Sequence, residues 1–502
     1  MSAHDGPAAD DQRRDALGVL APGFVGTELP DWLAGLLSDG LAGGWLFGHN
    51  VVDGDQLRAL SGAIHDRRGQ ALVCADEEGG TVTRLHHRDG SPWPGAWALG
   101  VVDDVQTTRA VYRGMGAELA AAGVDLTAAP VADVNSEPTN PVIGVRSFGA
   151  DADLVARHVT AAVHGLRDAG VASCAKHFPG HGSTTLDSHL DLPILDVDDD
   201  LLASRDLVPF AAAVRARVDT VMTGHLVVPG HGELPATLNP SLLRMLRDQV
   251  GFDGVICTDA LDMAAVADRF GRERSAVLAL AAGADLLCIG NPVFPGDDDA
   301  HADTLRLVEA IVAAVRADEL PADRLREAAA RVRGLGAAQA ARRQDRAGAG
   351  ADPVAPDPGD LDLARGAATR ALRVSGRCGH VAGAEVVGLS TRGNIASGAR
   401  QEVLTRVLAA GCGGTVRDLD ELLGTHPHTR AATRGGLVLV SDDHSDLADP
   451  RLGGLLARAD ALVHTGIRDV PPDFGVPCVI RTFGGGLAGA RAASEALAGA
   501  GR

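Results

Sequence analysis

The chain has 502 residues, of which 45% are hydrophobic, enough to fill the cores of roughly two to four packed domains. Its net charge of −20 and pI near 5.3 argue against a nucleic-acid partner, because such binding needs clustered basic side chains. No stretch approaches the roughly 18 apolar residues of a spanning helix, and the acidic, polar start does not resemble a secretory leader. We therefore expect no membrane partner.

The seven cysteines bear on the cellular compartment. They are odd in number and form no C-x-x-C pair. Four of them lie inside apolar runs, where a free cysteine packs as a small hydrophobic residue. These features predict a reducing, cytoplasmic location.

From about residue 20 to residue 290, short apolar runs alternate with helical patterns. Near-continuous apolar runs are typical of parallel strands that are buried on both faces. The eight expected strands are 23–27, 44–48, 71–76, 125–130, 171–177, 220–225, 254–259 and 284–290. The expected helices between them include 108–122, 154–169 and 201–217. Eight such units predict a (β/α)8 TIM-type barrel that occupies residues 1–340.

The composition changes after the predicted barrel. An Arg/Ala-rich helix end leads into GAGADPVAPDPGD, which has no periodicity and predicts a linker over residues 341–360. Five further apolar runs then alternate with helical patterns, at 371–374, 385–390, 436–442, 461–465 and 477–481. Residues 361–502 are therefore expected to form a second, smaller domain, an α/β sandwich.

Polar side chains end several of the expected barrel strands. These residues are Asp76, Lys176, His177, His225 and Asp259. In barrels of this type the reacting groups lie at the carboxyl ends of the strands, so the set predicts an active site. Lys176 is the single lysine among 46 basic residues, which suggests a position that needs a compact ammonium group rather than a guanidinium.

A long loop, 179–193, follows the strand that carries Lys176. Within it, the D-x-H spacing of Asp187 and His189 allows the carboxylate to contact one imidazole nitrogen and to stabilise the protonated ring. His189 is then a candidate proton shuttle. Spacing alone equally allows these two residues simply to hold the loop together.

Four segments resemble family 3 of the glycoside hydrolases, specifically its bacterial β-N-acetylhexosaminidase branch. They are DEEGGTVTRL (76–85), NPVIGVRSFG (140–149), KHFPGHG with DSH (176–189) and TDALDM (258–263). The resemblance covers about residues 20–340. It implies a retaining enzyme that removes terminal β-linked N-acetylglucosamine, with peptidoglycan fragments (muropeptides) as the substrate and peptidoglycan recycling as the process. It implies no metal and no organic cofactor, and it leaves the oligomeric state open.

The resemblance also assigns roles to individual residues. Asp259 corresponds to the nucleophile, and His189 assisted by Asp187 corresponds to the acid/base. The positions that match sugar-binding residues are Asp76, Arg84, Arg146, Lys176 and His177.

Two departures from the family pattern affect substrate recognition. Glu77 stands where the family commonly has glutamine, which would place a second negative charge beside Asp76. Aromatic residues are scarce, so Trp93 and Trp97 are the nearest candidates for stacking against a sugar, with packing in the core or a loop as the alternative.

Three other functions compete with hydrolysis through a glycosyl-enzyme. Phosphorolysis on the same fold is favoured by a neutral histidine acid/base, which would not repel phosphate. A metal-dependent barrel hydrolase could use zinc ligands drawn from His181, Asp187, His189 and His225. A binding module is weakly suggested by GGGLAG (484–489), although no acidic residue follows at the spacing that dinucleotide binding requires.

Overall fold

The fold was analysed in a computed structural model of the chain. The structure describes residues 7–188, 191–293, 299–348, 356–379, 381–389, 400–424, 436–442, 444–471 and 474–500. His189, the predicted acid/base, lies outside the described residues.

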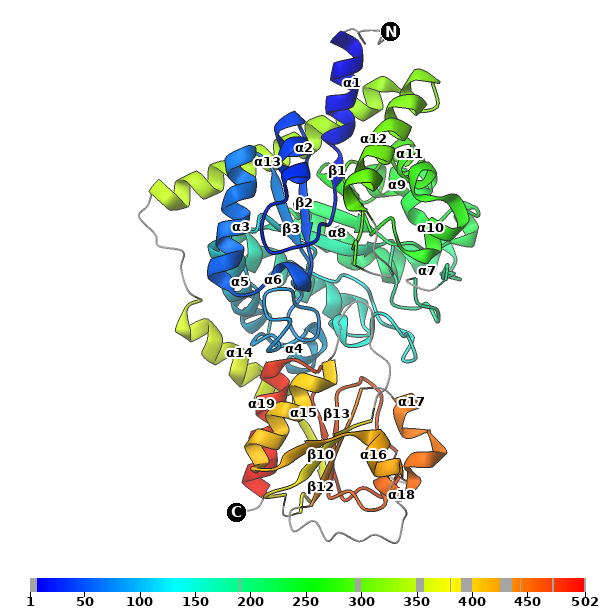
Figure 1. The fold of residues 1–502 in the computed structure, drawn as a ribbon. Coiled ribbons are helices and arrows are strands. Elements are labelled where there is room, and N and C mark those ends of the chain that lie inside the picture. Colours follow the sequence, from blue (N-terminus) through cyan, green and yellow to red (C-terminus); the bar gives the residue numbers. More distant parts are fainter. Residues whose placement is uncertain are drawn as a thin grey trace.

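The amino-terminal part is a ring of eight parallel strands surrounded by helices (Figure 1). The strands are β1 (Leu20–Ala21), β2 (Gly43–Leu46), β3 (Leu72–Ala75), β4 (Leu126–Thr127), β5 (Ala172–Phe178), β6 (Thr220–Thr223), β7 (Val255–Thr258) and β8 (Leu287–Cys288). Strands β2 to β7 pair in chain order, and β1 pairs with β8. Single bridges from Gly23 to Trp45 and from Cys257 to Leu286 close the ring. The predicted (β/α)8 barrel is confirmed.

The first expected strand was misplaced. The structure has β1 at Leu20–Ala21, whereas the prediction was 23–27, and Gly23 makes only the bridge to Trp45. Gly23 lies beside Gly290 just past the paired strands β1 and β8, and a Cβ on Gly23 would lie 2.3 Å from the carbonyl oxygen of Gly290.

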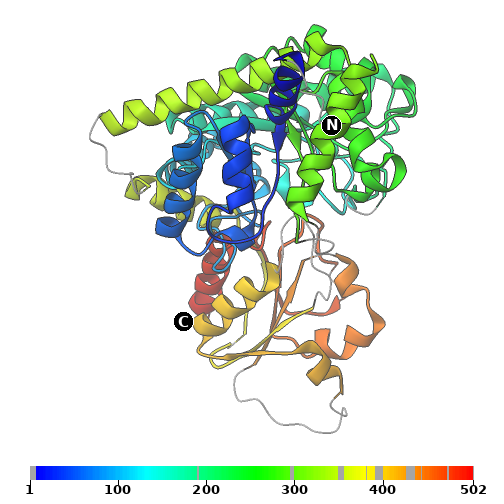
Figure 2. The same ribbon diagram turned by 45° about the horizontal axis from the view of Figure 1, so that its top comes forward.

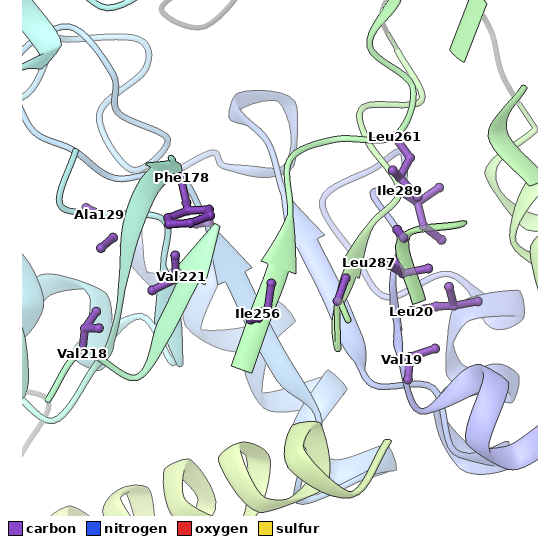
Figure 3. Packing of buried hydrophobic residues seen from close by; sticks show 14 of the residues in the cluster. Val19, Leu20, Ala129, Phe178, Val218, Val221, Ile256, Leu261, Leu287 and Ile289 are labelled. Atoms are coloured by element: carbon purple, nitrogen blue, oxygen red, sulfur yellow. The ribbon is translucent and has the colours of Figure 1, made fainter. Parts of the chain in front are cut away.

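Alternate side chains of each strand enter two different cores, which explains the near-continuous apolar runs. Trp45, Leu126 and Met222 belong to a cluster inside the barrel, together with the four free cysteines of the strands. Val221 and Ile256 belong to the larger cluster between strands and helices, part of which Figure 3 shows. Both faces of each strand are therefore buried.

The helices around the barrel lie largely where the periodicity placed them. They are α1 (Pro7–Leu17), α2 (Asp31–Asp39), α3 (Gly54–Arg67), α4 (Ala96–Val102), α5 (Val105–Ala121), α6 (Ala152–Asp168), α7 (Asp199–Leu201), α8 (Leu207–Arg215), α9 (Pro240–Asp248), α10 (Ala264–Phe270), α11 (Arg272–Ala282), α12 (Ala300–Arg316) and α13 (Ala322–Gly348). Within the expected helix 201–217, a π-helical turn at Leu202–Asp206 precedes α8.

The 27-residue helix α13 crosses the amino-terminal end of the barrel (Figure 1). Three aspartates lie just before β4, β6 and β8, and each accepts a backbone N–H from the neighbouring strand and pairs with arginines of α13. The pairs are Asp125 with Arg343, Asp219 with Arg342, and Asp285 with Arg324 and Arg331. These ion pairs fix the end of the barrel opposite to the predicted active site.

The carboxyl-terminal part is a six-stranded sheet with helices on both faces (Figure 2). Its strand order is β11-β10-β12-β13-β14-β9, and only β9 is antiparallel to its neighbour. The strands are β9 (Arg373–Gly376), β10 (Glu385–Gly388), β11 (Thr415–Arg417), β12 (Leu437–Ser441), β13 (Ala461–His464) and β14 (Cys478–Arg481). The helices are α14 (Pro358–Ala371), α15 (Arg400–Cys412), α16 (Leu419–Gly424), α17 (His444–Leu447), α18 (Gly453–Leu456) and α19 (Leu487–Ala500). The expected smaller α/β sandwich is present.

Two strands of this sheet differ from expectation. Strand β11 was not predicted, because its three residues are mostly exposed and form no apolar run. Strand β9 was expected to be buried, but all four of its residues are exposed at the edge of the sheet. Both are edge strands, which lack the two-sided burial that marks the inner strands.

Both ends of the predicted linker, 341–360, are helical, because α13 extends to Gly348 and α14 begins at Pro358.

Cys378 and Cys478 form a disulfide, whereas the sequence had suggested free thiols. Among the described residues, no helix combines the length and the apolar character needed to cross a membrane.

Candidate active site

The carboxyl ends of the barrel strands carry the predicted site. Lys176 and His177 lie near the carboxyl end of the long strand β5, and Asp76 and Asp259 directly follow β3 and β7. Arg146 ends a short 3-10 helix, Gly144–Arg146, in the loop after β4. Parallel strands deliver all these side chains to one rim of the barrel.

Lys176 is the centre of a buried network of charges. Its ammonium group donates to Oδ1 of Asp76 at 2.9 Å, and it lies 2.7 Å from Oε1 of Glu78. Only 2% of the Lys176 side chain is exposed to solvent. A second hydrogen bond, from Nε1 of Trp45 to Oδ2 at 3.1 Å, fixes the Asp76 carboxylate.

Two arginines extend this network. Arg146 makes a bidentate pair with Glu78, at 2.9 Å from Nε and 2.8 Å from Nη2, and its Nη2 lies 3.4 Å from Nε2 of His177. Arg84 lies 3.5 Å from Asp76. The structure therefore brings together all five residues that were predicted to bind the sugar.

The electrostatics of the network keep its carboxylates ionised. Burial opposes ionisation of Asp76, but the charges of Lys176 and Arg84 and the hydrogen bonds from Lys176 and Trp45 together hold the pKa of Asp76 well below its usual range. Burial likewise opposes ionisation of Glu78, but Arg146 and Lys176 lower the pKa of this carboxyl to about 2. Burial would lower the pKa of Lys176, but the two carboxylates raise it instead. The site thus offers fixed charges to a bound polar ligand.

Asp133, which was not predicted, orients both histidines of the strand-end segment. Its Oδ2 lies 2.8 Å from Nδ1 of His177, and its Oδ1 accepts the backbone N–H groups of His177 at 3.1 Å and His181 at 2.7 Å. Because a guanidinium group only donates, Arg146 beside Nε2 fits the His177 tautomer with its proton on Nδ1. Asp133 is completely buried.

Replacing Asp133 by asparagine should therefore disturb His177 and the start of the loop together. The amide can accept some of the three N–H groups, but its own NH2 group faces other donors. We expect a loss of about 2 kcal/mol in the free energy of unfolding. We also expect a higher KM, measured by urea titration and steady-state kinetics. Asp168→Asn, which removes a surface ion pair with Arg109, is the matched control and should change neither value. An unchanged KM for Asp133→Asn would contradict the orienting role.

Glu78 and Asp133 are thus the site residues that sequence reasoning missed. Glu78 was visible as the third carboxylate of DEEGG, and Asp133 lies three residues after the expected strand 125–130. A buried cation needs a carboxylate partner. Applied to Lys176 and Arg146, this requirement would have pointed to Glu78.

The Glu77 carboxylate is hydrogen-bonded within its own loop. Its side chain is buried, and its Oε2 accepts the Thr83 hydroxyl at 2.9 Å and the backbone N–H groups of Arg84 at 2.8 Å and Leu85 at 3.1 Å. Burial raises the pKa of Glu77. Glu77 therefore folds the loop that carries Arg84, which corrects the expectation that it would alter hydroxyl recognition.

The two tryptophans serve packing. Trp93 is completely buried and donates from Nε1 to Glu118 at 2.8 Å. Trp97 packs against a small cluster of Ala98, Ala371 and Phe483, the last two from the carboxyl-terminal part. The packing alternative is therefore correct for Trp93, and Trp97 lies against the carboxyl-terminal part.

Asp259 lies at the carboxyl end of β7, two strands from β5. Its backbone N–H donates to Thr223 at 3.1 Å, and its Oδ1 accepts the N–H of Ala260 at 2.8 Å. Asp262, in the same segment, accepts the N–H of Asn291 at 2.7 Å, and burial raises its pKa to about 6. The backbone thus holds Asp259 at the rim that Lys176 and His177 share.

His181 anchors the loop that leads to Asp187. Its Nδ1 lies 2.7 Å from the Thr184 hydroxyl, and its Nε2 lies 3.1 Å from the hydroxyl of Ser188, the residue after Asp187. Burial, with help from His177, lowers the pKa of His181 to about 4, so the ring is neutral at physiological pH.

Two of the four proposed zinc ligands, His181 and His225, are hydrogen-bonded to other groups. His225 lies 2.8 Å from the Thr237 hydroxyl and 2.8 Å from the Ala260 carbonyl oxygen, and His181 is bonded on both nitrogens. Among the residues that the structure describes, no group of three or more His, Cys, Asp or Glu side chains is arranged to hold a metal ion. His225 therefore connects the loops after β6 and β7.

A closed (β/α)8 barrel with carboxylates and cations at its carboxyl rim is one arrangement that glycoside hydrolases use. The model of the glycosyl hydrolase family 3 N-terminal domain matches residues 28–335. The chain therefore belongs to glycosyl hydrolase family 3.

Relatives and a solved structure agree with this membership. β-Hexosaminidase A of Pseudoalteromonas piscicida is 35% identical over 285 residues, which are 52% of this chain and 48% of that protein, about half its length. The β-hexosaminidase of Alkalilimnicola ehrlichii is 39% identical over 55% of this chain and 81% of its own length. A family 3 β-N-acetylglucosaminidase from Paenibacillus is 28% identical with a TM-score of 0.80, covering 98% of this chain and 97% of that chain.

Proposed function

We propose that the chain is a retaining β-N-acetylhexosaminidase that removes terminal β-linked N-acetylglucosamine. One observation carries the proposal: the network of Asp76, Arg84, Arg146, Lys176 and His177 shares the barrel rim with Asp259 in a family 3 chain. The similarity to proteins named β-hexosaminidase and to a β-N-acetylglucosaminidase supports this specificity.

In the proposed reaction the network binds the terminal sugar and leaves its anomeric carbon facing Asp259. The Asp259 carboxylate attacks this carbon, the bond to the leaving-group oxygen breaks, and a covalent glycosyl-enzyme forms. His189, assisted by Asp187, donates the proton that the departing oxygen needs. The histidine then removes a proton from water, and the water oxygen displaces Asp259 with net retention of configuration.

A His189→Ala variant tests the proposed acid. We expect turnover of a substrate with a sugar leaving group to fall by roughly 100-fold or more. A dinitrophenyl leaving group needs no proton, so the first step with this substrate should fall far less. Single-turnover release of both leaving groups measures the difference. His231→Ala, in the VPGHG segment that resembles FPGHG, is the control histidine. Equal losses with both substrates would contradict the acid role.

The substrate and the reaction type can be tested together. We expect cleavage of an aryl β-N-acetylglucosaminide and little cleavage of the matching aryl β-glucoside. The same assay with added phosphate separates hydrolysis from phosphorolysis, because sugar 1-phosphate forms only in the second reaction. A preference for the glucoside would refute the N-acetylhexosaminidase proposal.

The physiological role also remains a proposal. We propose a muropeptide that carries terminal N-acetylglucosamine as the natural substrate, in peptidoglycan recycling in the cytoplasm. The Cys378–Cys478 disulfide makes the location worth testing, because disulfides are uncommon in reducing compartments. Thiol labelling of the protein in intact cells would test it: a labelled pair supports the cytoplasm, and an oxidised pair would contradict it.

A further inference from the structure

The carboxyl-terminal part packs directly on a loop that carries sugar-site residues. This loop, residues 76–95, connects β3 to α4 and bears Asp76, Glu78 and Arg84 on its inner side. Figures 1 and 2 place α19 and α14 at the junction between the two parts, next to α4. A small pocket at this junction is lined by Gly80 and Trp93 of the loop and by Thr482, Gly484 and Gly486 from the segment between β14 and α19.

Glycines bring the two backbones together. A Cβ on Gly486 would lie 2.5 Å from the carbonyl oxygen and 3.0 Å from the Cα of Gly80. A Cβ on Gly90 would lie 2.7 Å from Cγ1 of Val403, on α15. Side chains larger than hydrogen at these positions therefore require one surface to move.

Polar contacts complete the junction. The backbone N–H of Ala488, in the first turn of α19, donates to the carbonyl oxygen of Ser91 at 3.3 Å. Arg406 of α15 donates to the carbonyl oxygen of Arg88 at 3.2 Å. The start of α19 therefore lies against the barrel loop, and Gly486 of GGGLAG serves this close contact.

Contacts within the loop 76–95 connect the residues that touch the second domain to the residues of the sugar site. Gly79 and Gly80 have φ of +78° and +60°, and the N–H of Gly80 donates to the Trp93 carbonyl at 2.8 Å. The Glu77 carboxylate, between Gly79 and the site, holds the backbone of Arg84. A displacement of Gly80 by the second sheet would therefore move Arg84 and Glu78 relative to Lys176.

We infer that the carboxyl-terminal domain is a positioning element of the sugar site, which acts by holding the loop 76–95 through the turn Gly484–Gly486 and helix α19. This inference rests on the proposed function, because it concerns binding in the same site. It gives the second domain a task that needs no ligand of its own.

The test is Gly486→Ala against the matched control Gly454→Ala, also in the second domain, where an added Cβ has nothing within 4 Å. For Gly486→Ala we expect a fall in kcat/KM of about 10-fold or more, because small displacements of positioned groups are costly. We expect most of it in KM, with weaker inhibition by free N-acetylglucosamine. Gly454→Ala should match the wild type.

A double-variant cycle separates positioning from general destabilisation. In an Arg84→Ala background, Gly486→Ala should change kcat/KM less than in the wild type, because one of the two groups that it displaces, Arg84, is already absent. Hydrogen exchange of residues 77–90 in the Gly486→Ala protein should increase, while exchange of strands β5 to β7 stays unchanged.

The inference is overturned if Gly486→Ala leaves KM unchanged, or if its effect is equally large in the Arg84→Ala background. If the wild-type protein cleaves no N-acetylhexosaminide, the proposed function fails first. The exchange data then still report whether the second domain holds the loop.

Discussion

Replacing Asp259 by asparagine is expected to reduce kcat by at least about a thousandfold, the largest loss of any single substitution in the chain. The amide retains the size of the side chain and can still accept the N–H of Ala260, so the fold should persist. What the variant loses is the negative charge that attacks the anomeric carbon. Steady-state kinetics on an aryl N-acetylglucosaminide measure the loss.

A second variant distinguishes a nucleophile from a structural carboxylate. Asp259→Ala leaves space for a small anion, so added azide should restore turnover and give a glycosyl azide of inverted configuration. The control is Asp253→Asn, an exposed carboxylate near the opposite end of β7, which should retain full activity. Substantial activity of Asp259→Asn without any added nucleophile would remove Asp259 from the proposed role.

Replacing Lys176 by methionine is expected to cost about 3–5 kcal/mol in the free energy of unfolding, more than any substitution of an exposed charge. The variant keeps the length of the side chain but leaves Asp76 and Glu78 side by side in a buried site without their shared ammonium group. Urea unfolding at neutral pH measures the change. Arg58→Ala, which breaks an exposed pair with Asp55, should lie within about 1 kcal/mol of the wild type.

The same variant should show an altered pH dependence. In the wild type, the pKa values of Asp76 and Glu78 are lowered on folding, so their stabilisation is present above their ordinary pKa and is lost as the pH falls through the folded-state values. Without Lys176 these pKa values should rise, so protonation favours the folded variant. The stability difference from the wild type should therefore shrink as the pH falls toward about 4. A difference that is constant with pH would contradict this account.

Much of the fold was predictable because most barrel strands are buried on both faces. Continuous apolar runs such as the one that ends at Lys176 carry this signal directly in the sequence. Exposed strands do not produce such runs. The sequence therefore did not reveal β11 or the exposure of β9, which are edge strands. The apolar pattern also misplaced the first strand, which lies at Leu20–Ala21 rather than at 23–27.

The candidate site was predictable where a residue ends a strand or belongs to a family motif, as Lys176 and Asp259 do. Its internal connections were not. Whether Glu77 or Glu78 faces Lys176 depends on the turn at Gly79 and Gly80, which is a property of three-dimensional packing. The contact of Gly486 with Gly80 joins positions some 400 residues apart, and a local pattern of glycines gives no sign of it.

The configuration of the first sugar product tests the central proposal most directly. Cleavage of an aryl β-N-acetylglucosaminide can be followed by proton NMR before the free sugar equilibrates between its anomers. Double displacement through Asp259 predicts that β-N-acetylglucosamine appears first and that the α anomer forms only later, by mutarotation. Initial release of the α anomer would contradict a glycosyl-enzyme on Asp259.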